Sequence, residues 1–473
     1  FSGRYDGSSR FPKDSRFGFF PSGSVGWVIS REKFIQPVIN FAKIDQLKLR
    51  ASYGVLGNQV LSNYYPYVAT MSSDYLTFPI NGNRPLYVNQ PEVVSNNMTW
   101  ETVRTLNFGG DITLLDNRFN LSFDKYIRYT EDMLVQSKEL PAVFGADSPK
   151  ENAGDLKTKG WELTLSYRDN FEVGGSPLTV GLTFNLSDAR TWVTRFDNET
   201  KNIDNGTRPG TANFYKGQEI GEIWGLVTDG FLTKDDLILD VNGNPTGKAK
   251  IDQTEVAEED NGRTVYEGDL KFKDLNGDGK ITYGKRNVDD PGDRRIIGNT
   301  QARLPYSFTI DAAYKGFDLR AFFYGVGKQD WYPVGNFHDF WGVFSNPWSS
   351  AIKANRDHWT PENPNAYFPR LKPYVAENTE LAAPQTKYLQ DASYFRLKNL
   401  TIGYTLPGTL TKRIHIERLR FYISAENLFT INHLKVKGID AELATSVQNY
   451  QYNTGTDKSV TLTNSAYYPQ QRV

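Results

Sequence analysis

The chain has 473 residues, and its 54 Lys and Arg against 55 Asp and Glu leave no basic field of the kind that nucleic-acid binding requires. It contains no cysteine, which excludes disulfide frameworks, thiolate zinc sites and cysteine nucleophiles. Aromatic residues make up 14% of the chain, yet no apolar run approaches the roughly 18 residues of a membrane-spanning helix.

Strict alternation of apolar and polar residues is the dominant local pattern and predicts β-strands. It is clearest at 178–187, where every second residue is Leu, Val or Phe. Helical periodicity is confined to short stretches such as 31–41 and 349–357. In chain order, we predict strands at 17–31, 45–54, 101–114, 118–134, 154–169, 178–192, 305–314, 317–328, 393–406 and 417–430. The fold class is therefore all-β.

The predicted connections alternate between short and long, and a long tail follows at 431–473. In an antiparallel sheet, all short connections then lie on one side and all long ones on the other. Outer-membrane barrels have this asymmetry, with short periplasmic turns and long extracellular loops. Asp116-Asn117 and Lys315-Gly316 also suit tight hairpins. We therefore favour an antiparallel transmembrane β-barrel over a soluble β-sandwich, which the alternation alone would allow.

A series of short motifs runs in order along nearly the whole chain. The motifs lie at 6–11 with 19–22, 47–54 with 57–59, 99–102, 159–163, 274–279 with 297–299, 314–319, 394–400 and 426–430. Together they resemble the barrel of SusC-like TonB-dependent outer-membrane transporters. The resemblance implies that residues 1–473 are the C-terminal portion of a transmembrane β-barrel that has 22 strands in the family, with long extracellular loops.

The resemblance also implies a function and partners. Members of the family import oligosaccharide or peptide nutrients across the bacterial outer membrane, surrounded by lipid or lipopolysaccharide. A SusD-like surface lipoprotein covers the extracellular side, and an N-terminal plug binds TonB to couple import to the proton-motive force. No segment of this chain resembles the plug, the TonB box or the final strand, so we expect TonB contact to lie in a missing N-terminal part.

An open set of strands would leave backbone edges unpaired at lipid depth, where each unpaired group costs several kcal/mol. We therefore expect strand 17–31 to pair with a part of the protein outside this chain. Pairing of strand 17–31 with strand 417–430 would contradict this expectation.

Catalytic motifs are scarce. The four histidines, at 338, 358, 415 and 433, lack zinc-type spacing, and the chain has no nucleophile elbow or P-loop. We therefore predict that the chain is not an enzyme and has no catalytic cofactor. Two alternatives stay open. One is a soluble or surface β-rich glycan-degrading enzyme with two suitably spaced carboxylates, and the other is a passive outer-membrane adhesin or structural barrel.

Two long connections, 193–304 and 329–392, are expected to be extracellular loops that carry binding functions. The second is rich in aromatic residues, whose rings suit sugars or a partner protein. The candidate contacts are Trp331, Tyr332, Phe340, Trp341 and Trp348. The alternative is that these rings form an interfacial girdle or pack the core of the loop itself. Polar residues expected to face the lumen are Lys48, Arg50, Glu162, Thr164 and Arg168.

Residues 274–285 follow most of the calcium-loop pattern. Positions 1, 3 and 5 are Asp274, Asn276 and Asp278, and a glycine at position 6 supplies the sharp turn. Position 12 is Lys285 instead of the usual bidentate Glu, so a carboxylate from 289, 290 or 293 would have to fold back. The predicted ligand set for a structural Ca²⁺ is Asp274, Asn276, Asp278, the backbone carbonyl of Lys280, and Asp290. The alternative is a metal-free Asx turn.

Overall fold

The computed structural model describes residues 1–59, 65–91, 93–135, 143, 149–197, 200–203, 214–257, 264–333, 337–345, 348–373 and 375–444. None of the helices in these residues combines the length and the hydropathy needed to cross a bilayer.

Eleven strands form one sheet, in the order β1-β2-β3-β6-β7-β8-β9-β16-β17-β20-β21. Their bounds are β1 (Ser2–Gly7), β2 (Phe17–Val28), β3 (Ile44–Asn58), β6 (Glu101–Leu114), β7 (Phe119–Val135), β8 (Glu151–Val173), β9 (Ser176–Phe196), β16 (Arg303–Tyr314), β17 (Phe317–Lys328), β20 (Tyr394–Thr405) and β21 (Arg420–Asn432). Each of the predicted strands is present in the predicted order. β1 is an additional strand that the sequence analysis missed.

The missed strand β1 corrects the expectation about pairing. It contains glycine at positions 3 and 7 and a single ring, so its alternation is weak. It pairs with β2 in an antiparallel register that runs from Ser2↔Ser22 to Gly7↔Phe17. The expectation that strand 17–31 pairs outside this chain is therefore wrong, because its neighbours are β1 and β3. Within the described residues, β21 pairs with β20 and not with β2.

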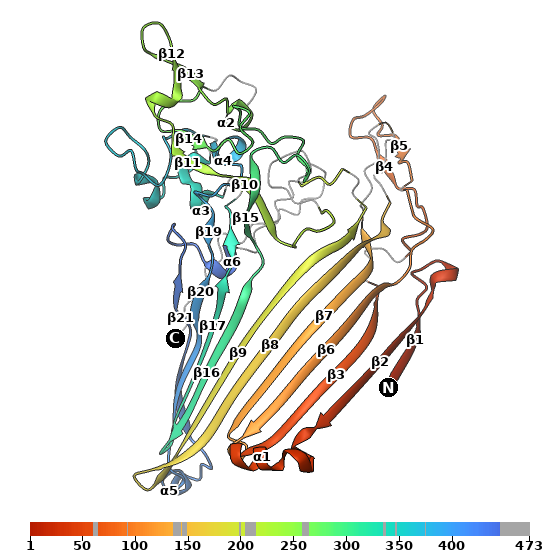
Figure 1. Cartoon of the computed structure of the whole chain (residues 1–473), viewed down its shortest axis with the longest axis vertical. Helices are drawn as coiled ribbons and strands as arrows, with labels where there is room; N and C mark the ends of the chain where they lie inside the picture. The colour runs from red at the N-terminus through yellow and green to blue at the C-terminus, as the bar shows by residue number, and fades with distance from the viewer. Residues whose placement is uncertain are drawn as a thin grey trace. The chain divides into compact units, whose positions relative to one another are not determined.

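The chain divides into two compact units, and each is described by itself. The first comprises Phe1–Leu163, Ala189–Lys201 and Phe214–Ile220. In this unit β1, β2, β3, β6 and β7 run side by side (Figure 1). Helix α1 (Gln36–Ala42) lies at one end of these strands, and the hairpin of β4 (Ser73–Tyr75) and β5 (Leu86–Val88) lies at the other. Further helical turns among the described residues of this unit are η1 (Lys13–Ser15), η2 (Ile29–Arg31) and η3 (Lys33–Ile35).

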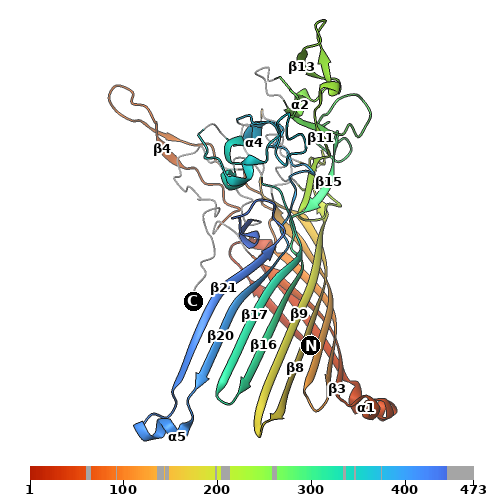
Figure 2. The same ribbon diagram turned by 90° about the vertical axis from the view of Figure 1, so that its left-hand side faces the viewer.

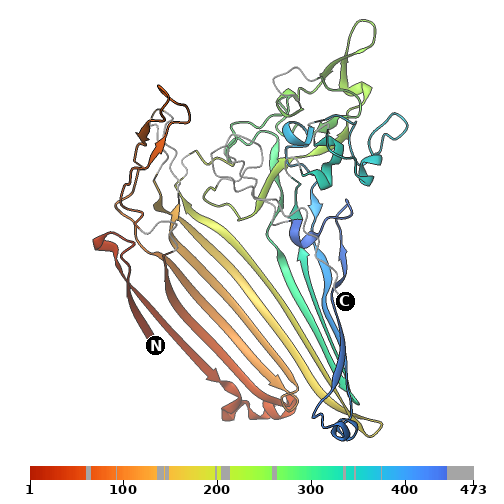
Figure 3. The same cartoon turned by 180° about the vertical axis from the view of Figure 1, so that it is seen from behind.

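The second unit comprises Thr164–Asp188, Asn202–Asn213 and Gly221–Val473. Its strands β16, β17, β20 and β21 run side by side, with α5 (Gly408–Thr411) at one end (Figure 2). The elements of its long connections gather at the other end (Figure 3). They are β10 (Glu222–Leu226), β11 (Thr228–Phe231), η5 (Lys234–Asp236), β12 (Leu237–Leu239), β13 (Pro245–Ala249), α2 (Thr254–Ala257), β14 (Leu270–Phe272), β15 (Arg294–Asn299), β18 (Asp330–Trp331), α3 (His338–Trp341), η6 (Gly342–Phe344), η7 (Lys353–Arg356), α4 (Val375–Asn378), β19 (Gln390–Asp391) and α6 (Ala441–Ala444).

The connection between β16 and β17 has the turn chemistry that the sequence predicts. Lys315 and Gly316, between β16 and β17, have φ of 46° and 86°. Two successive residues with positive φ match the right-handed twist of paired strands, and glycine adopts this conformation at no steric cost. At the corresponding end of the second unit, η8 (Lys412–Ile414) follows α5 and leads into β21.

The register sorts apolar and polar residues onto opposite faces of the sheet. In the second unit, one apolar row across five strands contains Leu182, Ile310, Ala321, Leu400 and Ala425. The adjacent row, on the other face, contains Gly181, Asp311, Arg320, Thr401 and Ser424. In the first unit, an apolar row contains Trp27, Leu49, Gly110 and Phe123, and the row beside it contains Gly26, Arg50, Gly109 and Asp124.

Many residues of the apolar face stay exposed in the described part of their own unit. Trp27 is 48% exposed and Phe123 41% in the first unit, while Ile402 and Ile423 are 51% and 69% exposed in the second. A soluble protein rarely leaves so extended an apolar surface open to water. The arrangement is typical of strands with one face in lipid and the other in a wet lumen.

Candidate functional site

The polar face of the first unit is organised around an ion pair that reaches across a strand. Arg50 on β3 lies 2.8 Å from Asp111 on β6 and 2.9 Å from Asp124 on β7. Gly109 is directly opposite both Arg50 and Asp124, and a Cβ at this position would overlap the Asp124 carboxylate. The absent side chain lets the guanidinium extend over β6 to β7.

The second unit repeats the arrangement with other residues. Arg420 on β21 donates from Nε to Asp318 on β17 at 2.9 Å. Gly403 on the strand between them is again the residue whose Cβ would overlap the pair. In both units, opposite charges on the polar face are therefore paired with each other. At these positions the polar face carries ion pairs rather than charge of a single sign.

The other four residues predicted to face the lumen lie, like Arg50, on the polar face. Lys48 is opposite Asp111, two residues before Arg50 on the same strand. Thr164 donates to Asn185 at 2.9 Å, and Asn185 donates to Ser307, its partner in the register. Arg168 lies against Gly181, which belongs to the polar row. Glu162 precedes Thr164 by two positions on β8 and so shares its face.

Motif residues of the first unit form a small core at one end of its strands. Phe11, Phe20 and Trp100, which belong to the motifs, are buried together with Met98. The rings of Phe11 and Trp100 lie 5.1 Å apart, and the Trp100 indole donates to the Arg16 carbonyl at 3.2 Å. The motifs at 6–11, 19–22 and 99–102 therefore serve a packing role.

The long connections of the second unit share a single hydrophobic core. Its buried members come from three separate stretches of the chain, with Leu226 and Phe272 in the first, Phe368 and Tyr388 in the second, and Leu434 in the third. We call these elements the loop subdomain, which comprises the described residues of 221–302, 329–393 and 433–444. A shared core fixes the relative positions of its segments, so the subdomain is a folded platform rather than a set of independent loops.

Most of the predicted aromatic contacts lie in this core. Trp331, Tyr332, Phe340 and Trp341 are 3%, 5%, 0% and 0% exposed. The Tyr332 hydroxyl donates to the Leu381 carbonyl at 2.7 Å, and burial raises the pKa of this phenol well above its usual value. These four rings favour the alternative in which the aromatics pack the core of the loop itself. Trp348 differs from them, because 76% of it is exposed.

The predicted calcium loop is held by bonds from its own backbone. The Asp274 carboxylate accepts the N–H groups of Gly277 at 2.6 Å and Gly279 at 2.8 Å, and these bonds hold its pKa below the usual range, with that of Gly279 the largest cause. Asn276 accepts from the Asp278 N–H, and Asp278 in turn from the Lys280 N–H. This geometry is that of the Asx-turn alternative, and it also presents three oxygen-bearing side chains on one short turn.

The acidic residue that folds back onto this loop is Asp293 rather than Asp290. Asp293 is fully buried, and its carboxylate accepts the N–H groups of Leu275 at 2.7 Å and Thr282 at 2.8 Å. Asp290 accepts from Lys285 through its backbone carbonyl instead. In the described parts of the chain, no three His, Cys, Asp or Glu residues are arranged to hold a metal. Calcium binding therefore stays a prediction.

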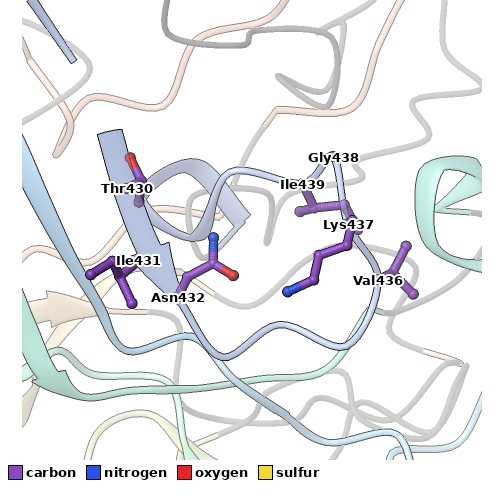
Figure 4. Close-up of a pocket in the computed structure, with 7 residues that line it drawn as sticks. All are labelled: Thr430, Ile431, Asn432, Val436, Lys437, Gly438 and Ile439. Carbon is purple, nitrogen blue, oxygen red and sulfur yellow. The ribbon is translucent and has the colours of Figure 1, made fainter. Parts of the chain in front are cut away.

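A cavity of about 350 Å³ lies where the chain leaves β21. It is lined by Thr430, Ile431, Asn432, Val436, Lys437, Gly438 and Ile439 (Figure 4). The Lys437 side chain extends toward Asn432 in this view. The lining offers one charged group and no acid–base pair, so the cavity provides room for a side chain or a small ligand without catalytic chemistry.

Just beyond this cavity, the chain is fixed to the polar face of β20. Arg396, which is 2% exposed, donates to Glu442 at 2.7 Å, to Thr430 at 2.8 Å and also to Asp440. Lys398 lies 2.6 Å from Glu442. The sequence analysis missed this contact because no short-range pattern links a strand arginine to two acids more than forty residues later.

Long antiparallel strands with an exposed apolar face and a polar face of matched charges define the wall of an outer-membrane β-barrel. Residues 1–228 match the family model described as TonB dependent receptor-like, beta-barrel. The chain is 32% identical over 444 residues to TonB-dependent receptor P3 of Formosa agariphila, covering 91% of this chain and 39% of that protein. It is 27% identical over 464 residues to TonB-dependent receptor SusC of Bacteroides thetaiotaomicron, covering 96% and 40%.

The fold agrees with a solved transporter. The structure of the RagAB peptide transporter matches with a TM-score of 0.64 and 23% identity, covering 92% of this chain and 42% of that one. Residues 1–228 therefore form part of a TonB-dependent receptor β-barrel, and the chain as a whole is similar to TonB-dependent receptors, SusC among them. It spans about two fifths of the length of these relatives. They are named as receptors and not as enzymes, in agreement with the sequence analysis.

Proposed function

We propose that the protein to which this chain belongs imports oligosaccharide or peptide nutrients through the outer membrane in a TonB-dependent manner. The observation that carries the proposal is the two-faced sheet, whose polar rows provide a wet wall and whose apolar rows suit lipid. The relatives named SusC and RagAB support the same function for the whole protein, and the RagAB structure is described as a peptide transporter.

The partners follow from the same reasoning. A SusD-like lipoprotein would contact the loop subdomain, since binding sites are commonly carried by loops that a rigid scaffold positions. TonB would act through the plug of the whole protein. Within this chain, Trp348 is the predicted contact residue that remains exposed to meet cargo or a partner. We retain a structural Ca²⁺ at 274–285 as a further proposal.

The experiment that tests import uses the whole protein in its producing cells. Uptake of fluorescent oligosaccharides and of fluorescent peptides would be followed in the wild type, in a deletion strain and in a strain without TonB. We expect both deletions to abolish uptake of one cargo class. Uptake that persists in the deletion strain would contradict import by this protein. If the deletion changed adhesion and left uptake unchanged, the passive alternative would be supported.

The contact role of the stretch 331–348 is tested by a point substitution, because a deletion would disturb the fold. Deleting that stretch would remove the buried rings of Trp331, Phe340 and Trp341 and unfold the loop subdomain. Trp348→Ala changes an exposed ring instead. We expect weaker co-purification of the lipoprotein or weaker uptake, with unchanged barrel assembly. Normal co-purification together with normal uptake would show that Trp348 contacts neither the partner nor the cargo.

A further inference from the structure

A second cavity, of about 410 Å³, lies wholly within the loop subdomain. Its volume falls in the range of small-molecule sites, which are typically lined by rings and a few directed polar groups. The lining residues that matter are Tyr266, Glu267, His358, Trp359, Thr360 and Arg370. None of them belongs to the strands of the large sheet.

The two rings of this cavity are held in place by the backbone. The Trp359 indole packs against Gly268, where a Cβ would overlap the ring, and the backbone N–H of Trp359 donates to the Phe368 carbonyl at 3.0 Å. Gly268 has a φ of 87°, which few other residues adopt. The indole of Trp359 therefore packs closely against the backbone of Gly268 at the cavity.

Tyr266 provides the second ring, and 42% of it is exposed. Its backbone N–H donates to Asp269 at 2.8 Å, and Asp269 is held in turn by Lys372 at 2.6 Å. The Arg370 guanidinium carbon lies 5.1 Å from the centre of the Tyr266 ring. The tyrosine is therefore positioned before any ligand arrives, which lowers the entropic cost of binding.

The polar groups of the cavity include both donors and acceptors. His358 Nδ1 lies 2.8 Å from the Asn355 carbonyl, and a carbonyl can only accept, so Nδ1 carries the proton and Nε2 of the neutral ring is an acceptor. Glu267 also accepts, Arg370 donates, and the Thr360 hydroxyl does both. The charges of Glu267 and Arg370 offset each other, so the lining does not select a charged ligand.

We propose that this cavity is a binding site for a neutral saccharide. Sugar hydroxyls donate and accept at once, which suits a lining of mixed donors and acceptors, and the flat apolar face of a pyranose suits the exposed side of an aromatic ring. A charged peptide terminus or a phosphate would gain less, because the lining has no net charge. The use of this site in nutrient capture rests on the proposed import function, whereas the binding itself does not.

The test is isothermal titration of the purified whole protein in detergent with uncharged hexasaccharides of glucose, xylose and mannose. A neutral hexapeptide is the competing ligand class. The variants are Tyr266→Ala and the isosteric Glu267→Gln. The matched control is Tyr75→Ala, which removes a 56% exposed tyrosine from the β4–β5 hairpin. Near-ultraviolet circular dichroism of each variant checks that the fold is retained.

We expect at least one hexasaccharide to bind, with affinity reduced roughly three- to tenfold by Tyr266→Ala, as loss of one ring contact implies. Glu267→Gln should also weaken binding, and Tyr75→Ala should leave it unchanged. The proposal is overturned if no hexasaccharide binds, if Tyr75→Ala has the same effect, or if only the hexapeptide binds in a Tyr266-dependent way. Intact uptake with no saccharide binding would overturn the site alone, and intact binding without uptake would overturn import alone.

Discussion

Gly109 and Gly403 show at the scale of single residues how the polar face accommodates its charges. Each lies on the strand between an arginine and its carboxylate partner, and each leaves room that a Cβ would fill. Neither glycine needs a positive φ, so turn chemistry does not explain them. The sequence predicts the charges on this face from alternation, but it does not reveal which glycine lies beneath which ion pair, because that depends on register.

The first prediction tests this role. Gly109→Ala should displace Arg50 or Asp124 and lower the free energy of unfolding by about 1–3 kcal/mol, the usual cost of overpacking. Gly110→Ala is the matched control, since a Cβ there would lie 3.6 Å from its nearest neighbour, an ordinary contact. The measurement is the temperature at which the folded barrel loses its altered gel mobility. Equal shifts for both variants would contradict the role of Gly109.

A second prediction concerns calcium at 274–285. If Ca²⁺ binds, adding it should raise the melting temperature of the whole protein, and chelation should reverse the effect. Asp278→Asn should abolish the calcium response, because Asp278 is exposed and contributes a charged oxygen ligand. Asp240→Asn, in the turn between β12 and β13, serves as the control. A melting temperature that is insensitive to calcium would leave the metal-free Asx turn as the role of this loop.

At the scale of elements, alternation is sufficient to predict ten of the eleven strands of the large sheet and insufficient to predict β1 or the loop subdomain. The strands follow a period of two that depends on local sequence alone. The rings of 331–344 show no such period, and the core that they join also includes residues of β10, β14 and the segment after β21. Contacts between distant segments therefore decide whether a ring in a loop is buried or exposed. For this reason the local sequence does not distinguish the buried ring of Trp331 from the exposed ring of Trp348.

The contact between Arg396 and the segment after β21 leads to a third prediction. Arg396→Met should destabilise this segment by about 3–5 kcal/mol, because it leaves the nearly buried Asp440 without its cation. Hydrogen exchange of residues 434–442 should accelerate accordingly. Arg4→Met is the control, because it removes an arginine that is 80% exposed and paired to Asp6. It should lower the free energy of unfolding by about 1 kcal/mol or less. Unchanged exchange at 434–442 would show that the hydrophobic contacts alone fix the segment.

A fourth prediction addresses the side of the membrane on which each connection lies. The chain has no cysteine, so single cysteines can be introduced without background. Val241→Cys, at a fully exposed tip between β12 and β13, should react with a membrane-impermeant maleimide on intact cells. Phe41→Cys, 92% exposed on α1, should react only after the outer membrane is opened. The reverse pattern would place the loop subdomain on the periplasmic side.

At the scale of the whole molecule, the account depends on which face of the sheet meets lipid. Adjacent residues on one strand provide the most direct test, because they share a depth and differ only in face. Ser24 and Val25 form such a pair on β2, and Thr401 and Ile402 form another on β20.

The decisive measurement is the reaction of single cysteines at these four positions in the whole protein in lipid vesicles. The probes are a water-soluble maleimide and a lipid-soluble quencher of an attached fluorophore. We predict that Val25→Cys and Ile402→Cys are quenched from the lipid and react poorly with the aqueous reagent. Ser24→Cys and Thr401→Cys should escape quenching. Equal quenching of both members of a pair, or stronger quenching of the serine and threonine positions, would contradict the assignment of the apolar rows to the bilayer.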